Sequence, residues 1–218
     1  MNNCGIMCFG ETEWQTREII ESQVNVNLLG TMRVTKAFLP LIRQQKSRII
    51  NVTSHCGLRT LPGLPIYCAT KAGLNAFTEG LRLDMKKYGV EVVNFIPGSF
   101  VMSSNISSAQ SKQASEMRGA LNEEQINFYG EYFDRYFKYL DVISGEREPQ
   151  LVSPLILETF NEALLDIPPK SQYICEPARY KFFHGLFKYT PQPVTDFLLQ
   201  KFMAMPEFDP KKSSIKNL

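Results

Sequence analysis

Two hydrophobic periods alternate between residues 12 and 97, and this alternation restricts the chain to few architectures. Residues 12–44 and 66–88 repeat apolar positions every three or four residues, the period of an amphipathic helix. Residues 48–54 and 90–97 are short apolar runs rich in β-branched residues, as in buried strands. Strands separated by a helix pair in parallel, so the order predicts an α/β fold, the C-terminal part of a doubly wound parallel sheet.

Local signals set the expected ends of these segments. Thr12 and Gln15 have the spacing of a capping box, so we expect the first helix to begin at Thr12. Pro40 is expected to bend that helix near its end, and Gly89 to end the second helix. The right-handed crossover rule places the 66–88 helix across one face of the sheet.

The rest of the chain is interpreted as part of one domain spanning residues 1–218. Residues 103–150 form an insert, polar at first and then rich in Phe and Tyr. It is expected either to cover a ligand or to pack as an amphipathic helix on the body, and the sequence favours neither. A helix is expected over 153–165 and a last strand over 171–176. The apolar tail, 178–218, is either a packing tail or a surface that contacts a membrane or a partner.

One pair of residues points to chemistry. Tyr67 and Lys71 are four apart in an expected helix, so they share a face. A nearby ammonium favours the phenolate and should lower the pKa of Tyr67, which could then exchange a proton with an alcohol or carbonyl oxygen. Ser54 follows the first strand, at the end where functional groups gather in such sheets, and could hold the same oxygen. A Tyr-x-x-x-Lys pair alone is usually structural, but this strand–loop–helix context is specific.

In this order the motifs resemble the short-chain dehydrogenase/reductase family. The residues that carry the resemblance are Asn2-Asn3-Cys4-Gly5, Asn27-Leu28-Leu29-Gly30, Asn51-Val52-Thr53-Ser54, Tyr67-Cys68-Ala69-Thr70-Lys71 and Pro97-Gly98. The likeness is specific from residue 2 to about residue 106 and looser to about 205. It is nearest the branch that holds 3-hydroxybutyrate, retinol and 17β-hydroxysteroid dehydrogenases.

The resemblance implies a role for each matched position. Tyr67 would be the acid/base, Lys71 would lower its pKa and bind the nicotinamide ribose, Ser54 would position the substrate oxygen, and Asn27 would anchor a water connecting Lys71 to solvent. The cofactor-binding residues would be Asn2, Cys4 and Gly5 near the adenosine, Tyr67 and Lys71, and Pro97 and Gly98 near the nicotinamide. The implied cofactor is NAD or NADP. The implied reaction interconverts an alcohol and a ketone or aldehyde on a small lipid-like or hydroxy-acid substrate.

The sequence also departs from the family pattern. The family's threonine after Pro-Gly is Met102 here, and Ser104-Asn105 is the expected replacement. No G-x-G-x-x-G motif occurs, so no glycine loop at a helix N-terminus is available to hold a pyrophosphate. Two or three family βα units would precede residue 2, so the chain is interpreted as N-terminally truncated. The alternative to an enzyme is a catalytically dead isoform that acts as a dimerisation partner of a full-length relative.

The remaining observations exclude or leave open other classes. The net charge of +2 gives no strong field for nucleic acid. Five cysteines without a CxxC pair indicate reduced thiols and no metal site. His184, among phenylalanines, is interpreted as a packed aromatic rather than a ligand. We expect a homo-oligomer through the 12–44 and 66–88 helices and peripheral membrane contact, and the resembling branch implies a mitochondrial or endoplasmic reticulum location.

Overall fold

A computed structural model of the chain describes residues 1–98, 106, 108–144 and 153–209, and its centre is a parallel sheet. The strands β1 (Arg48–Val52), β2 (Glu91–Pro97) and β3 (Gln172–Cys175) lie in the order β1-β2-β3. Asn51 pairs with Asn94, and Asn94 pairs in turn with Gln172. The predicted α/β class and parallel pairing are confirmed.

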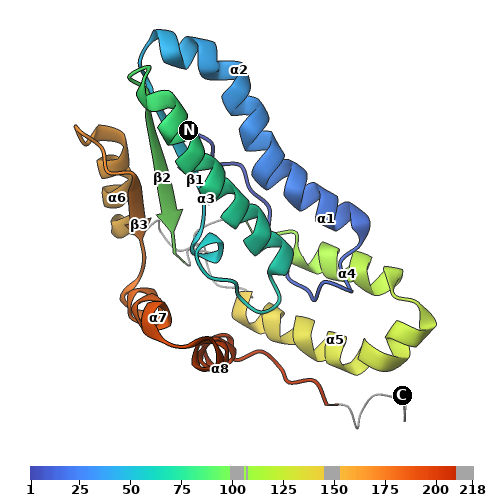
Figure 1. Cartoon of the computed structure of the whole chain (residues 1–218). Coiled ribbons are helices and arrows are strands. Elements are labelled where there is room, and N and C mark those ends of the chain that lie inside the picture. Colours follow the sequence, from blue (N-terminus) through green and yellow to red (C-terminus); the bar gives the residue numbers. More distant parts are fainter. Residues whose placement is uncertain (99–105, 107, 145–152, 210–218) are drawn as a thin grey trace.

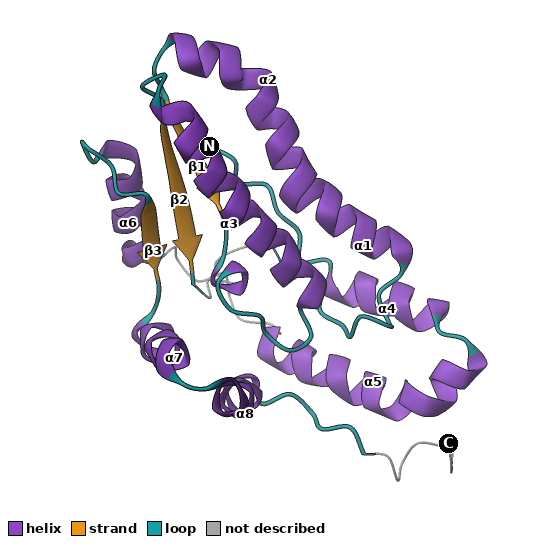
Figure 2. Cartoon of the chain, in the orientation of Figure 1, coloured by secondary structure: helices purple, strands orange, loops and turns teal. Residues whose placement is uncertain are grey.

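Helices cover both faces of this sheet (Figures 1 and 2). On one face lie α2 (Thr31–Gln44) and α3 (Pro65–Lys86), and on the other lies α6 (Pro154–Leu165). The period of two in the strands explains both contacts: Ile49 and its neighbours face α2 and α3, whereas Ile50 faces α6. Each fully buried Ile or Val of this kind contributes about 1.5–3 kcal/mol by leaving water.

The first helical segment is continuous but begins later than predicted. It consists of α1 (Arg17–Val24), the π-helix η1 (Asn25–Gly30) and α2. The N-cap is Thr16, whose hydroxyl accepts from the Ile19 amide, so the capping box predicted at Thr12 is wrong. Gln15 instead donates to the Gly10 carbonyl and accepts from Gln23 inside the core.

The other ends agree closely with the sequence signals. Pro65 is the first residue of α3, and Gly89 follows its end at a φ of +71°. Pro40 lies inside α2. The first strand stops at Val52, two residues before its predicted end, because Ser54 caps the short 3-10 helix η2 (His55–Gly57).

The insert and tail are largely helical. The helices α4 (Gln110–Ala120) and α5 (Glu123–Ser144) enclose Trp14, which is 1% exposed. The α5 aromatics Phe133, Tyr136 and Phe137 pack on it, so much of this aromatic face forms core. Ligand covering by 103–150 stays a prediction.

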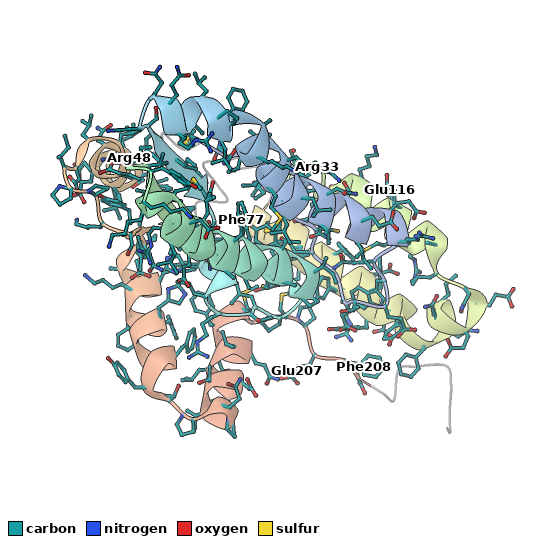
Figure 3. All side chains as sticks on the ribbon, turned by 45° about the horizontal axis from the view of Figure 1, so that its top comes forward. Arg33, Arg48, Phe77, Glu116, Glu207 and Phe208 are labelled. Atoms are coloured by element: carbon teal, nitrogen blue, oxygen red, sulfur yellow. The ribbon has the colours of Figure 1, made fainter. Side chains whose placement is uncertain are left out.

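The tail contains α7 (Ala178–Tyr189) and α8 (Gln192–Met203), which follow β3. In Figure 3 Phe208 lies beyond α8, where its ring packs against Phe128 of α5. Within the described part of the chain, no helix is both long and apolar enough to cross a membrane.

Candidate active site

The predicted catalytic residues come from three elements that meet beside the carboxyl end of β1. Ser54 follows that strand, Tyr67 and Lys71 lie in the first two turns of α3, and Asn27 lies in η1. Tyr67, Lys71 and Asn27 are buried, and Ser54 is half-buried. The register of α3 against β1 therefore brings together residues that are up to 44 positions apart in the sequence.

Ser54 is fixed beside Tyr67. The Ser54 hydroxyl accepts from the Cys56 amide at 3.1 Å, which fixes it at the start of η2. The Ser54 side chain is close enough to the Tyr67 phenol to favour its ionised form. Burial, with the Cys56 thiol next in importance, nevertheless raises the pKa of Tyr67 above its ordinary value. The phenol is therefore a protonated hydrogen-bond donor at neutral pH.

Lys71 is buried, and it forms no ion pair with a carboxylate of the described residues. Its Nζ donates to the Val52 carbonyl at 3.2 Å and lies 5.8 Å from the Tyr67 ring centroid. Burial lowers the pKa of Lys71 to about 8. The expectation that Lys71 depresses the pKa of Tyr67 is not met in this structure, because desolvation dominates both groups and the ammonium faces a carbonyl.

Asn27 ties the first segment of the chain to α3. Its Oδ1 accepts from the Ile6 amide at 2.8 Å, and its Nδ2 donates to the Ile6 carbonyl and to Thr70 Oγ1. Gly5 lies against the same groups: a Cβ there would be 3.4 Å from Lys71 Nζ and 3.5 Å from Asn27 Oδ1. The structure thus places Gly5, Asn27 and Lys71 together.

The other two residues of the first motif lie differently. Asn2 pairs in parallel with β1, where its amide donates to the Ile50 carbonyl at 2.8 Å and its carbonyl accepts from the Val52 amide. Its side chain donates to Asn51 Oδ1 at 2.8 Å. Asn2 is therefore committed to the sheet in this structure, whereas Cys4 is exposed.

Pro97 and Gly98 end β2 beside the end of β3. The Gly98 amide donates to the Cys175 carbonyl, and a Cβ at Gly98 would lie 3.1 Å from that oxygen. The close approach explains why glycine follows the strand. Met102, Ser104 and Asn105, the residues predicted to replace the family threonine, lie outside the described residues.

Sequence reasoning missed several neighbours of the site. The thiols of Cys56 and Cys68 lie close enough to each other and to Tyr67 to shift its pKa.

His184 packs against Phe187 and stacks on His55, in agreement with its interpretation as a packed aromatic. Its Nδ1 is also 2.8 Å from a Glu176 carboxylate oxygen, a contact that the sequence did not indicate. No spacing rule links His55, Glu176 and His184, because they come from the ends of β1 and β3 and from α7.

Comparison with known proteins agrees with this geometry. Residues 1–114 match the family described as short chain dehydrogenase. The mitochondrial D-beta-hydroxybutyrate dehydrogenase of Rattus norvegicus is 34% identical over 176 residues, covering 79% of this chain and 51% of the relative. Retinol dehydrogenase 16 of the same species is 31% identical over 217 residues, covering 95% of this chain and 65% of the relative.

The solved structures agree in fold. A short chain dehydrogenase/reductase from Burkholderia phymatum, determined in complex with NAD, has a TM-score of 0.63 at 20% identity. It aligns with 83% of this chain, which covers 62% of it. The chain spans about half the length of the hydroxybutyrate dehydrogenases it matches.

Proposed function

We propose that this chain, which belongs to the short-chain dehydrogenase family, supplies the acid/base residues of an NAD(P)-dependent oxidoreductase. The reaction interconverts an alcohol and its ketone or aldehyde. One observation carries the proposal: Tyr67, Lys71 and Asn27 are buried beside the carboxyl end of β1, the strand that Ser54 follows. A serine and a tyrosine hydroxyl on one oxygen form a proton-transfer pair.

The residues perform separate tasks in the proposed reaction. When bound, the nicotinamide would accept or donate the hydride. In the reduction direction, Tyr67 donates its phenolic proton to the carbonyl oxygen, and Ser54 holds that oxygen by a second hydrogen bond. The raised pKa of Tyr67 keeps the proton in place until a substrate or cofactor changes its surroundings. A Lys71 ammonium turned toward the phenol would then stabilise the phenolate that remains.

The residues present fit the ribose end of a dinucleotide. Lys71 Nζ is buried and donates a hydrogen bond to the Val52 carbonyl, and the absence of a side chain at Gly5 leaves space beside it. The sequence contains no glycine-rich loop for the pyrophosphate. We therefore propose that dinucleotide binding requires a glycine-rich βα unit paired along the edge of β1 where Asn2 bonds.

A groove supports a substrate of moderate size. It has a volume of about 900 Å³ and is lined by the 58–65 loop, by Tyr129 of α5 and by Leu199 of α8. The groove adjoins Pro65, two residues before Tyr67, so we place the part of the substrate remote from the reacting oxygen there. This position would give α5 the predicted covering role.

The reaction class is tested by restoring a glycine-rich unit. The segment of the rat hydroxybutyrate dehydrogenase that precedes its matched region is fused to Met1 of this chain. The fusion is expected to bind NADH or NADPH, with a blue shift of the nicotinamide fluorescence, and to reduce the oxidised cofactor with a hydroxy acid, retinol or a steroid alcohol. A fusion that folds by circular dichroism and binds the cofactor, yet oxidises no alcohol of this panel, would contradict the proposal.

The second candidate function is that of a partner protein. On α2, Val34, Phe38 and Leu41 lie at helical spacing and are each about half exposed, and Leu83 of α3 is 65% exposed. We propose that these faces pair with a second copy or with a full-length relative.

A further proposal is peripheral contact with a membrane surface. Exposed aromatic side chains on α7 and α8, including Phe182 and Phe197, support it. The proposed location remains mitochondrial or endoplasmic reticulum.

A further inference from the structure

Three side chains of types that bind metal ions lie together beside the ends of β1 and β3, and the proposed reaction does not use them. His55 follows Ser54 at the end of β1, Glu176 follows the last residue of β3, and His184 lies in the second turn of α7. The two strand ends and the helix therefore present one ligand each to a common point. Two imidazoles and a carboxylate are the protein ligands of one common type of zinc site.

The distances are close to those of a coordination sphere. Glu176 Oε2 lies 2.8 Å from His184 Nδ1 and 3.4 Å from His55 Nε2. All three potential ligand atoms are within 4.8 Å of one another. Zinc bonds of about 2.0–2.1 Å at tetrahedral angles place ligand atoms roughly 3.3 Å apart. Binding of one ion would require the imidazoles, now stacked at 4.0 Å between ring centroids, to turn so that both direct a nitrogen at it.

His55 provides the second observation. Its side chain is only 6% exposed, and neither ring nitrogen has a hydrogen-bond partner among the described residues. A buried polar atom without a partner costs about 1–3 kcal/mol.

We propose that His55, Glu176 and His184 bind one divalent transition-metal ion, zinc foremost, and that the ion fastens α7 to the loop that carries Ser54. The carboxylate of Glu176 offsets part of the ion's charge, and the bound metal satisfies the orphaned nitrogen of His55. Three protein ligands leave a fourth position for water. The inference does not depend on the proposed hydride transfer.

The test is a zinc titration of the full chain after chelator treatment, followed by calorimetry and competition with a chelating dye. We expect one zinc per chain. His184→Asn is the informative variant, because the Asn amide can still donate to Glu176 but does not replace an imidazole ligand. Removing a ligand should weaken binding by about 100-fold or more, since loss of an outer-shell partner alone costs 10–100-fold. Glu176→Gln should weaken it similarly, and circular dichroism establishes that each variant folds.

The control experiments test whether cysteine thiols bind the zinc instead. The sequence has two histidines and five cysteines, and the absorption spectrum of the cobalt-loaded chain distinguishes thiolate ligands from imidazole ligands. We expect no thiolate charge-transfer band and unchanged zinc affinity in Cys4→Ser and Cys68→Ser. The proposal is overturned if the folded wild-type chain binds no zinc, if His184→Asn and Glu176→Gln bind it as tightly as wild type, or if binding is lost in a Cys→Ser variant.

Discussion

Lys71 is a buried cation without a carboxylate partner among the described residues. It is 3% exposed and donates to a backbone carbonyl, and burial lowers its pKa from 10.5 to about 8. Below pH 8 the folded state therefore contains a buried ammonium, which destabilises it. As the pH rises from about 8 toward 10.5, the folded state loses this proton before the unfolded state does, and stability from this residue increases.

The pH dependence of Lys71→Met tests this account. Methionine is similar in length to lysine but has no group that titrates. The stability advantage of the Lys71→Met variant over wild type should therefore shrink by on the order of 3 kcal/mol between neutral pH and about pH 10. Urea denaturation of both proteins across this range measures the difference. A difference that stays constant with pH would show that the ammonium is not buried as described.

Gly57 is a residue where the backbone requires the absence of a side chain. A Cβ there would lie 2.7 Å from the backbone C and O of Lys71. Gly57→Ala should therefore push η2 away from α3, with a loss of about 1–3 kcal/mol. Gly80→Ala, in the facing helix α3, is the control, since nothing lies within 4 Å of a Cβ placed there, and it should stabilise by roughly 0.5–1 kcal/mol. Thermal melts of both variants check the pair, and equal effects would contradict the close approach.

At this scale the sequence indicated residue types better than their environments. The spacing of Tyr67 and Lys71 correctly placed both on one helix, but it did not reveal that both would be buried. Thr12 and Gln15 have the spacing of a capping box, but the helix begins after Thr16. The packing of Trp14 decides this, since its ring is required in the core beside α5.

Among the elements, the π-helix η1 has the clearest functional position. It joins α1 to α2 without a break and points Asn27 at Ile6 and Thr70. Single π-turns of this kind often occur at functional sites. A sequence period of three to four does not distinguish a π-turn from ordinary helix, so the element was not predictable.

Asn27→Ala tests what this element holds together. The substitution leaves the Ile6 amide and carbonyl and the Thr70 hydroxyl without their partner, so we expect a loss of about 3 kcal/mol or more in the free energy of unfolding. Asn25→Ala, at an exposed position of the same π-helix, should change it by no more than about 0.5 kcal/mol. Chemical denaturation compares the two, and similar losses would refute the role of Asn27.

The longer elements were predictable because their hydrophobic patterns are strong. The ranges 66–88 and 90–97 agree with α3 and β2 to within one or two residues, and 153–165 agrees with α6. The polar start of the insert gave no comparable signal. There α4 is held by Met117 against Trp14, a contact that no local pattern encodes.

For the whole molecule, the exposed apolar face of α2 is the surface through which we propose that two copies associate. We expect the chain to self-associate with increasing concentration in light scattering, and Phe38→Glu to shift it toward the monomer. Phe38 is 56% exposed, and burying its ring would contribute about 1.5–3 kcal/mol per copy. Val142→Glu, at a 74% exposed position of α5, is the control and should leave the association unchanged. A monomer at all concentrations would exclude this interface.

The arrangement of the whole sheet was predictable only in part. The alternation of periods indicated parallel strands, and their order followed from the connections. The meeting of His55, Glu176 and His184 depends on β1 and β3 ending at one edge with β2 between them, and a linear pattern contains no such information. The pairing of Asn2 with β1 likewise appears only in three dimensions.

The most direct test of the central claim is the effect of Tyr67→Phe on the fusion that carries a glycine-rich unit. Binding of NAD(P)H and single-turnover hydride transfer are measured on the same preparations. We predict unchanged folding, near-normal cofactor binding and a rate reduced by about 100-fold or more, as expected on removal of a general acid/base. A Tyr67→Phe protein that transfers hydride at the parental rate would contradict the assignment of Tyr67 as the acid/base.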